Sequence, residues 1–488
     1  MLAYGAWYAI LKAKGVNKME KWARIKYQPC LPLGDNRSLI TGCARHIALS
    51  REAAEEGIVL LKNEGNILPL RKGTRLAIFG KAQIDYVKGG GGSGDVYCAY
   101  VRDIYESLSM KKGQVEVFDK LSLFYKAYVE EAYKSGGTNG RLEEAVLSED
   151  LVKEAASAAD VAVITINRYS AEEEDRKNDG KDAYFTLSEN EKRMIETVTA
   201  TFEKVIVLLN TGAMIDVSWF SKNPKIQGAL MLWQGGMEGA GAAANILVGD
   251  VTPSGKLVDT CAESFDDYPS SEGYHASPDY VEYTEDIFVG YRYFETVPGK
   301  KERVVYPFGY GLSYTEFSME NIRASVAGEE IVITLDVQNI GAYAGKEVVE
   351  VYFAAPEGKI TKPRRVLCGF GKTKLLAPGE CEKLTLSFAV SDMASYDDAG
   401  DVEKSADVLE RGAYKIFVGG NVRDAKEIDF SYVLAEDKIV KKLTEYCTPT
   451  KLTKRLMADG TYREVSAKAY TPKTFAPPTF RGTKPLET

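Results

Sequence analysis

An acidic run follows one strand-like stretch of the sequence. After Asn167, where VAVITIN ends, come Glu172, Glu173, Glu174, Asp175 and Arg176. Crowded carboxylates raise one another's pKa, so one of them could stay protonated as a general acid while Arg176 keeps a neighbour ionised. Such an acid has a use in glycoside hydrolysis, where it protonates the departing oxygen and a second carboxylate attacks or activates water. On composition alone, an acidic run is more often a solvated loop.

A glycine-rich segment, VKGGGGSGDV at residues 87–96, follows a different strand-like run, RLAIFG. Gly89, Gly91 and Gly94 have the spacing of a dinucleotide-binding fingerprint. In that fingerprint the first glycine turns directly out of the strand, whereas KAQIDYVKG intervenes here. We therefore expect a loop whose glycines let another group approach closely, and nucleotide binding is the alternative.

The elements that carry these two loops alternate between strand and helix. Apolar runs such as RLAIFG, VAVITIN and IQGALM are separated by helical patterns between residues 45 and 265. This alternation predicts a mostly parallel sheet covered on both faces, an α/β sandwich. We expect helices over ARHIALSREAAEEGIVLLKN and DVYCAYVRDIYESL, which repeat apolar residues at helical spacing. Both loops should then lie at the carboxyl edge of the sheet, where ligand sites form in such domains.

The pattern changes after about residue 315. EEIVITLDVQN, KEVVEVYFAAP, CEKLTLSFAV and AYKIFVGG alternate in hydrophobicity and predict an all-β sandwich of about seven antiparallel strands. Tyrosines and phenylalanines are concentrated just before it and favour interdomain packing over sugar stacking. We expect an N-terminal extension (1–44), the α/β domain (45–265), an aromatic-rich connector (266–315), the β-sandwich (316–435) and a linker (436–488).

Composition excludes several classes of function. The net charge of -8 over 488 residues provides no basic footprint, so we expect neither nucleic acid nor membrane as a partner. Seven cysteines without a CxxC spacing favour a reducing, cytoplasmic location. Only two histidines are present, which excludes a histidine-rich metal site, and we expect no metal and no cofactor.

Several segments in one order resemble family-3 glycoside hydrolases, which include β-glucosidases. They extend across residues 45–320: REAAEEGIVLLKNEGNILPL, KGGGGSGDV, YSAEEEDRKN, GALMLWQGGMEGAGAAANILVGDVTPSGKLVDT, DIFVGYRYFET and YPFGYGLSYTEF. The β-sandwich behind them looks like that family's fibronectin type III-like domain. The resemblance implies an α/β sandwich beside a (β/α)8 barrel, a retaining mechanism and an oligosaccharide or β-glucoside substrate.

The resemblance also implies a role for individual residues. The family's acid/base loop reads Ser-Gly-Glu-Gly-aromatic-Asp-Arg, and Ser170 to Arg176 match it with Glu172 at the acid/base position and Glu173 as the fallback. This sequence departs where Glu173 replaces a glycine and Glu174 an aromatic residue. The residues expected to contact substrate are Lys88, Gly91, Ser93, Asp175 and Arg176.

The sequence lacks room for the barrel that carries the family's nucleophilic aspartate. About 45 residues precede the α/β region and about 50 follow the β-sandwich, whereas a (β/α)8 barrel needs at least about 200. We interpret the chain as the front part of a circularly permuted enzyme, nearly inactive alone and requiring a barrel as partner. A non-catalytic carbohydrate-binding or scaffold protein is the alternative. An exposed barrel-facing surface would also favour a homo-oligomer.

Overall fold

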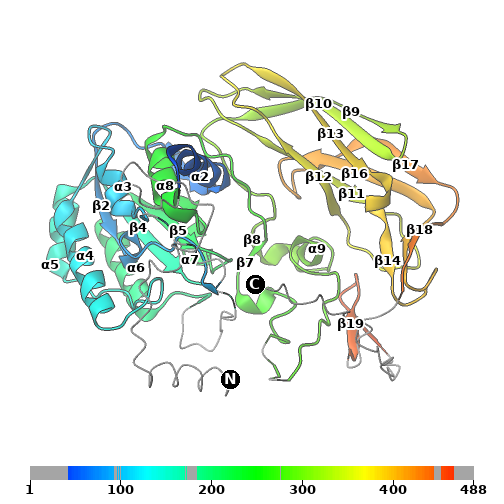
Figure 1. Ribbon diagram of the computed structural model, residues 1–488, viewed down its shortest axis with the longest axis horizontal. Coiled ribbons are helices and arrows are strands. Elements are labelled where there is room, and N and C mark those ends of the chain that lie inside the picture. The colour runs from blue at the N-terminus through cyan, green and yellow to red at the C-terminus, as the bar shows by residue number, and fades with distance from the viewer. Residues whose placement is uncertain are drawn as a thin grey trace, which may run out of the picture.

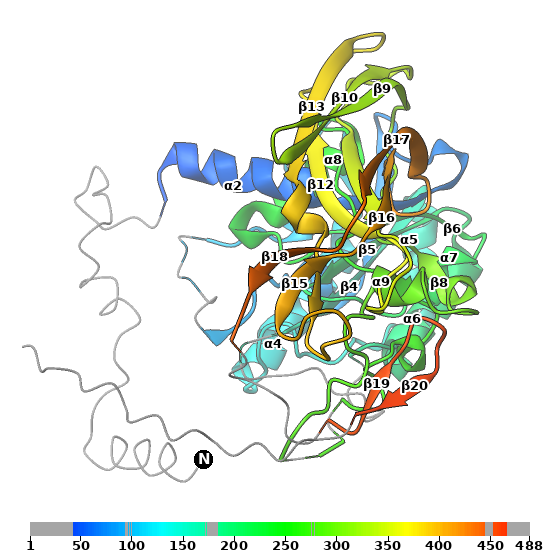
Figure 2. The same ribbon diagram turned by 90° about the vertical axis from the view of Figure 1, so that its right-hand side faces the viewer.

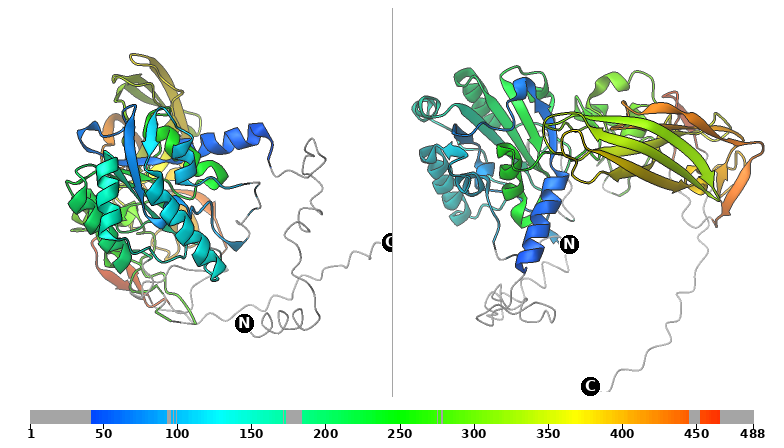
Figure 3. Two further views of the ribbon diagram at one scale, coloured as in Figure 1. Left: turned by 90° about the vertical axis from the view of Figure 1, so that its left-hand side faces the viewer. Right: turned by 90° about the horizontal axis from the view of Figure 1, so that it is seen from above.

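The structure is a computed structural model that describes residues 42–92, 96, 98, 100–170, 172, 184–274, 276–277, 279–444 and 452–465. An α/β domain and a β-sandwich lie side by side, joined by a connector below them in Figure 1 and seen from above in Figure 3. This confirms the predicted fold class. The described residues contain no (β/α)8 barrel.

A six-stranded sheet forms the centre of the α/β domain. In spatial order its strands are β1 (Val59–Asn63), β6 (Ile226–Met231), β5 (Val205–Thr211), β4 (Val161–Arg168), β2 (Thr74–Phe79) and β3 (Val115–Val117). Every pairing is parallel except that of the edge strand β1, which runs antiparallel to β6. All residues of β4 and β5 are buried, as expected for central strands covered on both faces.

Helices cover both faces of the sheet. They are α2 (Ala44–Gly57), α3 (Ile104–Ser109), α4 (Asp119–Lys134), α5 (Glu149–Ala158), α6 (Glu189–Thr201), α7 (Ser218–Ser221) and α8 (Gly239–Val248). One core packs α4, α5 and α6 against one face, and a second core packs α3 and α8 against the other (Figure 1). Helix α2 packs on α8, and its first turns extend beyond the body of the domain (Figure 2).

Two predicted helices are shorter than the sequence pattern indicated. The first ends at Gly57, Ile58 is its C-cap with an extended backbone, and Leu61 belongs to the edge strand β1 instead of the helix face. The apolar run IVLL fits a buried strand as well as a helix, so periodicity alone could not separate the two. The second helix begins only at Ile104, where Asp103 accepts the backbone N–H of Glu106 as an N-cap.

The β-sandwich is built from two antiparallel sheets. One contains β13 (Cys381–Ala389), β10 (Glu330–Asn339) and β9 (Phe317–Ala327). The other contains β12 (Val366–Lys372), β11 (Val348–Ala354), β16 (Gly412–Gly419) and β17 (Lys426–Leu434). These seven strands enclose a core to which β10 contributes Ile331, Ile333, Leu335 and Val337.

Part of the segment expected to be a linker is folded. A third small sheet joins β14 (Ser395–Asp397), β15 (Ala406–Leu409) and β18 (Lys438–Lys442), and β19 (Lys454–Leu456) pairs with β20 (Tyr462–Glu464) as a hairpin. Arg455 of this hairpin forms an ion pair with Asp398, beside the end of β14. The hairpin is therefore fastened to the β-sandwich.

The connector carries α9 (Tyr291–Phe294) and β8 (Val304–Tyr306), and β8 pairs with β7 (Cys261–Ala262) at the end of the α/β domain. Tyr291 packs against Phe308 and, edge-on, against Tyr352 of the β-sandwich, with ring centroids 4.7 and 6.1 Å apart. The aromatic cluster thus holds the connector to the β-sandwich, although Tyr283 is exposed. No helix in the described part of the chain is long and apolar enough to span a bilayer.

Candidate active site

The glycine-rich loop and the acidic loop lie at the same edge of the sheet. Strands β2 and β4 are parallel neighbours. The acidic loop directly follows β4, and the glycine-rich loop follows β2 after the short 3₁₀ turn η4 (Lys81–Gln83). The carboxyl ends of neighbouring parallel strands are where α/β domains hold ligands, so both loops are placed where a site can form.

The carboxyl group of Glu172 is exposed, yet it lies against the glycine-rich loop. A Cβ atom added to Gly92 would lie 2.2 Å from Oε2 of Glu172 and 2.6 Å from its Cβ. Gly92 also has a φ of +67°, a backbone conformation that side chains disfavour. The glycines therefore permit a close approach, and the group they approach is this carboxylate. An anion in that position opposes the binding of a phosphate.

Two further residues expected to contact substrate are described. The amine of Lys88 donates a hydrogen bond to the carbonyl of Val96 at 2.9 Å, across the glycine-rich loop. The carbonyl of Lys88 accepts one from the N–H of Gly236, also at 2.9 Å. Gly91 is half-buried within the loop. The remaining predicted site residues lie outside the described part of the chain: Ser93, Glu173, Asp175 and Arg176.

Two asparagines fasten the chain that leads into the glycine-rich loop. Asn167 of β4 and Asn210 of β5 are register partners on adjacent strands, and both are buried. The side chain of Asn210 accepts from the N–H of Val87 at 2.7 Å and donates to its carbonyl at 2.9 Å. Asn167 donates to the carbonyl of Asp85. Sequence reasoning missed these anchors, although VAVITIN and VIVLLN both end in asparagine.

Arg168, the last residue of β4, closes the base of the acidic loop. Its guanidinium group pairs with both carboxylate oxygens of Glu191 at 2.8 Å. It also donates to the carbonyls of Tyr184 and Thr186, at 3.2 and 2.9 Å. Burial alone would raise the pKa of Glu191, but the charge and hydrogen bonds of Arg168 hold that pKa below its usual value. One buried arginine therefore joins the two ends of the loop that contains Glu172.

A second buried polar cluster supports the same edge. The amine of Lys81 donates to the side-chain carbonyl of Asn167 and lies 3.7 Å from the carboxylate of Asp85. The backbone N–H of Lys81 donates to Glu144 at 3.0 Å. Burial raises the pKa of Glu144 to about 7. The side chains of Lys81, Asp85 and Glu144 are all buried, so they support the loops and do not reach a ligand outside.

The end of β6 contributes a strained backbone to this edge. Trp233 has a φ of +56°, unusual for a bulky residue, and its carbonyl accepts a hydrogen bond from Asn210 at 2.7 Å. The next residue, Gln234, lies with Ser170 against Gly212, where an added Cβ would be 2.8 and 2.7 Å from their side-chain oxygens. Residues in such rarely populated backbone conformations are common at functional sites.

The arrangement separates one accessible acid from several enclosed ones. Asp85, Glu144 and Glu191 are buried and held by partners within the protein. Glu172 belongs to the acidic loop, is exposed, and lies against Gly92 of the glycine-rich loop. Among these four described carboxyl groups, Glu172 is the exposed one.

Comparison with known proteins shows long matches to β-glucosidases. The chain is 49% identical to β-glucosidase A of Butyrivibrio fibrisolvens over 482 residues, covering 92% of this chain and 58% of that protein. It is 40% identical to a β-glucosidase of Ruminococcus albus, covering 84% of this chain and 43% of the relative. The chain thus spans about half the length of these relatives.

Solved structures agree with these matches. A β-glucosidase from Paenibacillus barengoltzii superposes with a TM-score of 0.82 at 38% identity, covering 88% of this chain and 49% of that one. β-Glucosidase 3B from Thermotoga neapolitana, in complex with α-D-glucose, superposes with a TM-score of 0.74 at 36% identity, covering 83% and 56%.

Two family profiles match within the chain. Residues 347–422 match the fibronectin type III-like domain. Residues 58–314, more than half of the chain, match the glycosyl hydrolase family 3 C-terminal domain. With both loops of the candidate site inside the second match, the chain belongs to glycosyl hydrolase family 3.

Proposed function

We propose that this chain forms part of a retaining glycosidase that hydrolyses terminal β-D-glucosyl residues, with Glu172 as the acid/base. The observation that carries the proposal is the contact between Glu172 and Gly92 at the carboxyl edge of the family-3 domain. In the first step Glu172 protonates the departing glycosidic oxygen. In the second it accepts a proton from the water that hydrolyses the glycosyl-enzyme intermediate.

The nucleophile is proposed to come from a (β/α)8 barrel outside this chain. A retaining enzyme needs a second carboxylate at about 5–5.5 Å from the acid. The three enclosed carboxylates described above already bind partners within the protein. The relatives are about twice as long as the matched region, which leaves length for a barrel. A permuted order, with the barrel after the β-sandwich, stays a prediction that the coding sequence downstream of Thr488 tests.

Complementation with a barrel tests the proposal. The 488-residue chain is mixed with, or fused to, the part of the Butyrivibrio relative that it does not match, and hydrolysis of nitrophenyl β-D-glucoside is followed. We expect little turnover from either part alone and restored turnover from the pair, with β-glucose as the first anomer released. With cellobiose, whose leaving group needs a proton, Glu172→Gln should abolish most of the gain, whereas Glu143→Gln, which changes an exposed glutamate elsewhere, should not.

Three other results would each favour a different explanation. Turnover by the isolated chain that is lost in Glu172→Gln would show that the nucleophile lies within these residues. A complemented pair that binds saccharide but never hydrolyses it would support a carbohydrate-binding protein without catalysis. Binding of a dinucleotide by the isolated chain would support the nucleotide-binding alternative instead.

A further inference from the structure

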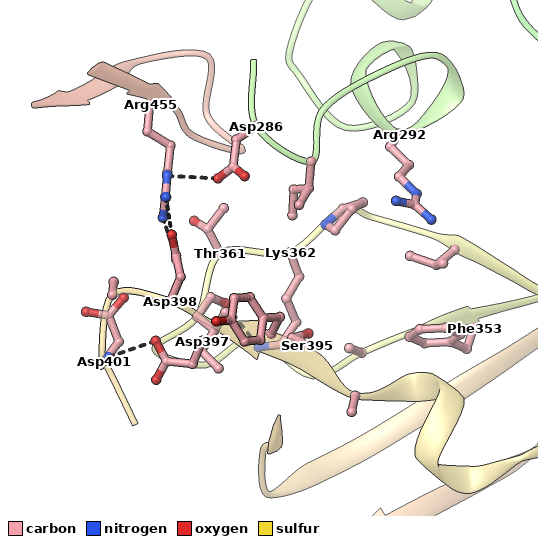
Figure 4. A pocket seen from close by; sticks show the side chains of 18 of the residues that line it. Asp286, Arg292, Phe353, Thr361, Lys362, Ser395, Asp397, Asp398, Asp401 and Arg455 are labelled. Carbon is pink, nitrogen blue, oxygen red and sulfur yellow. Dashed lines mark hydrogen bonds and ion pairs between the residues drawn. The ribbon is translucent and has the colours of Figure 1, made fainter. Parts of the chain in front are cut away.

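A cavity of about 310 Å³ lies away from the candidate active site. It is enclosed by the β-sandwich around β14, by the connector at Asp286 and Arg292, and by the hairpin β19–β20 (Figure 4). None of its described lining residues comes from the α/β domain between residues 45 and 265. Its volume falls in the range of small-molecule sites.

The walls of this cavity are held together by charge pairs between its segments. Arg455 of the hairpin binds Asp398 and Asp286, from the β-sandwich and the connector, as the dashed lines in Figure 4 mark. Asp397 accepts four backbone N–H groups, from residues 400 to 403. Lys362 pairs with Glu410. These groups fix the shape of the cavity before any ligand enters, which lowers the cost of binding.

Several donors facing the cavity have no partner within the described part of the chain. The guanidinium group of Arg292 extends from α9 toward Phe353 without an ion pair or a hydrogen bond (Figure 4). The hydroxyl groups of Thr361, Ser395 and Tyr396 also line the cavity, and no hydrogen bond to a described residue uses them. Tyr396 is 47% exposed.

The chemistry of this lining favours a polyhydroxylated ring. Unused donors stand beside carboxyl oxygens in the lining, and sugar hydroxyl groups both donate and accept hydrogen bonds. Carboxylates in the lining outnumber cationic side chains, five to four, which disfavours a phosphate or another small anion. Phe353, Tyr396 and Val366 supply the apolar surface that the faces of a sugar ring require.

We propose that this cavity is a second saccharide-binding pocket, which takes a mono- or disaccharide through Arg292 and Tyr396 and is separate from the edge that carries Glu172. The pocket is preformed by the pairs described above. It does not depend on the proposed hydrolysis, because none of its residues takes part in that reaction. Occupancy would add a contact between the protein and a glycan that is not the bond being cleaved.

Saturation-transfer NMR on the 488-residue chain tests this pocket with D-glucose and cellobiose as probes. We expect transfer to at least one of them, with a dissociation constant of about 1 mM. Arg292→Ala should weaken binding about tenfold, since it removes a charged hydrogen-bond donor, and Tyr396→Ala should weaken it independently. Arg364→Ala, which removes an exposed arginine near the pocket, is the matched control and should leave binding unchanged.

Several outcomes would overturn the proposal. They are an absence of transfer to both sugars, binding that survives both Arg292→Ala and Tyr396→Ala, and binding lost in Glu172→Gln but kept in Arg292→Ala. Inorganic phosphate that competes with the sugar at equal concentration would assign the pocket to anions instead. Thermal unfolding of each variant separates loss of the pocket from loss of the fold, and Thr361→Val provides a milder change at the same wall.

Discussion

The contact between Gly92 and Glu172 connects two sequence features that looked independent. The sequence predicted both loops, their edge of the sheet and the close approach that glycines allow. It did not predict that the approaching group is the carboxylate of Glu172, because that contact joins residues 80 positions apart and depends on the pairing of β2 with β4. Asn167 and Asn210 were missed for the same reason, since their role appears only when adjacent strands bring them together.

Gly92→Ala should impair catalysis more than stability. The added methyl group would overlap Glu172 and displace it, and misplacement by about 1 Å can cost about 100-fold in kcat/KM. Gly65→Ala is the matched control, because Gly65 has a similar φ of +62° with no atom within 4 Å of an added Cβ. Activity is measured in the barrel-complemented enzyme. Equal losses in the two variants would mean that the backbone penalty, and not the contact with Glu172, is responsible.

The buried carboxyl group of Glu144 should make stability depend on pH. Its pKa is raised from 4.5 to about 7, so the folded state binds the proton more tightly than the unfolded state. The free energy of unfolding therefore falls as pH rises from about 4.5 to above 7. Glu144→Gln should remove this fall. Between about pH 5 and pH 8 the free energy of unfolding of the variant should therefore rise relative to that of the wild type, by up to roughly 3 kcal/mol.

Denaturant unfolding at the two pH values measures this difference. Glu143→Gln changes the neighbouring glutamate, which is exposed, and should follow the wild-type pH dependence. A Glu144→Gln protein whose stability changes with pH as the wild type's does would show that Glu144 ionises normally in the folded protein.

At the level of helices and strands, repeated patterns were predicted well and boundaries poorly. Continuous apolar runs between helices predicted that the strands of the first sheet run mostly parallel. Alternation of apolar and polar residues predicted the seven strands of the β-sandwich. The sequence assigned IVLL to a helix because it continues the apolar spacing of α2, whereas the chain leaves the helix at Gly57 to form an antiparallel edge. Only the partner strand β6 decides between these two possibilities.

The Arg168 pair should be a main support of the acidic loop. Arg168→Ala leaves the carboxylate of Glu191 buried without its cation and should lower the free energy of unfolding by about 3–5 kcal/mol. Arg75→Ala breaks the exposed pair with Asp160 and should cost far less, because water screens that pair. Urea unfolding compares the two.

A double variant, Arg168→Met with Glu191→Met, separates charge from packing. Removing both charges should recover much of the stability lost in Arg168→Ala, because no buried ion is left unpaired. Activity of the barrel-complemented double variant should stay low if the arginine is needed to hold the two ends of the loop together. Full activity would show that the loop is positioned by other contacts.

Across the whole molecule, the α/β domain and the β-sandwich meet through charged side chains at the end of α2. Glu56 pairs with Lys346 and Lys372. Lys346 lies just before β11, and Lys372 is the last residue of β12. Lys256 and Glu347 form another pair across the same boundary at 2.9 Å. One family profile matches the α/β domain and the other matches the β-sandwich. The ion pairs between them help to set the orientation of the two matched domains.

Glu56→Gln should weaken this boundary at neutral pH. Although burial acts to raise it, the two lysines hold the pKa of Glu56 below 4.5, so its contribution is complete above that value and is lost as pH falls further. The partly exposed pairs should be worth about 1 kcal/mol. Calorimetric unfolding should show a lower Tm for Glu56→Gln at about pH 7, and a smaller difference from wild type at about pH 3.

Glu52→Gln, one turn earlier on α2 and exposed, is the control for Glu56→Gln and should leave the Tm unchanged. A Glu56→Gln protein that is less stable to the same degree at both pH values would show that the charge of Glu56 does not hold the two domains together.

Anion rescue tests the proposed role of Glu172 most directly. In the barrel-complemented enzyme, Glu172→Gly should still form a glycosyl intermediate from dinitrophenyl β-D-glucoside, whose leaving group needs no proton. Azide should then enter the space left by the side chain, speed turnover and yield β-D-glucosyl azide. If no azide product forms, or if the variant hydrolyses cellobiose as fast as the wild type, Glu172 is not the acid/base.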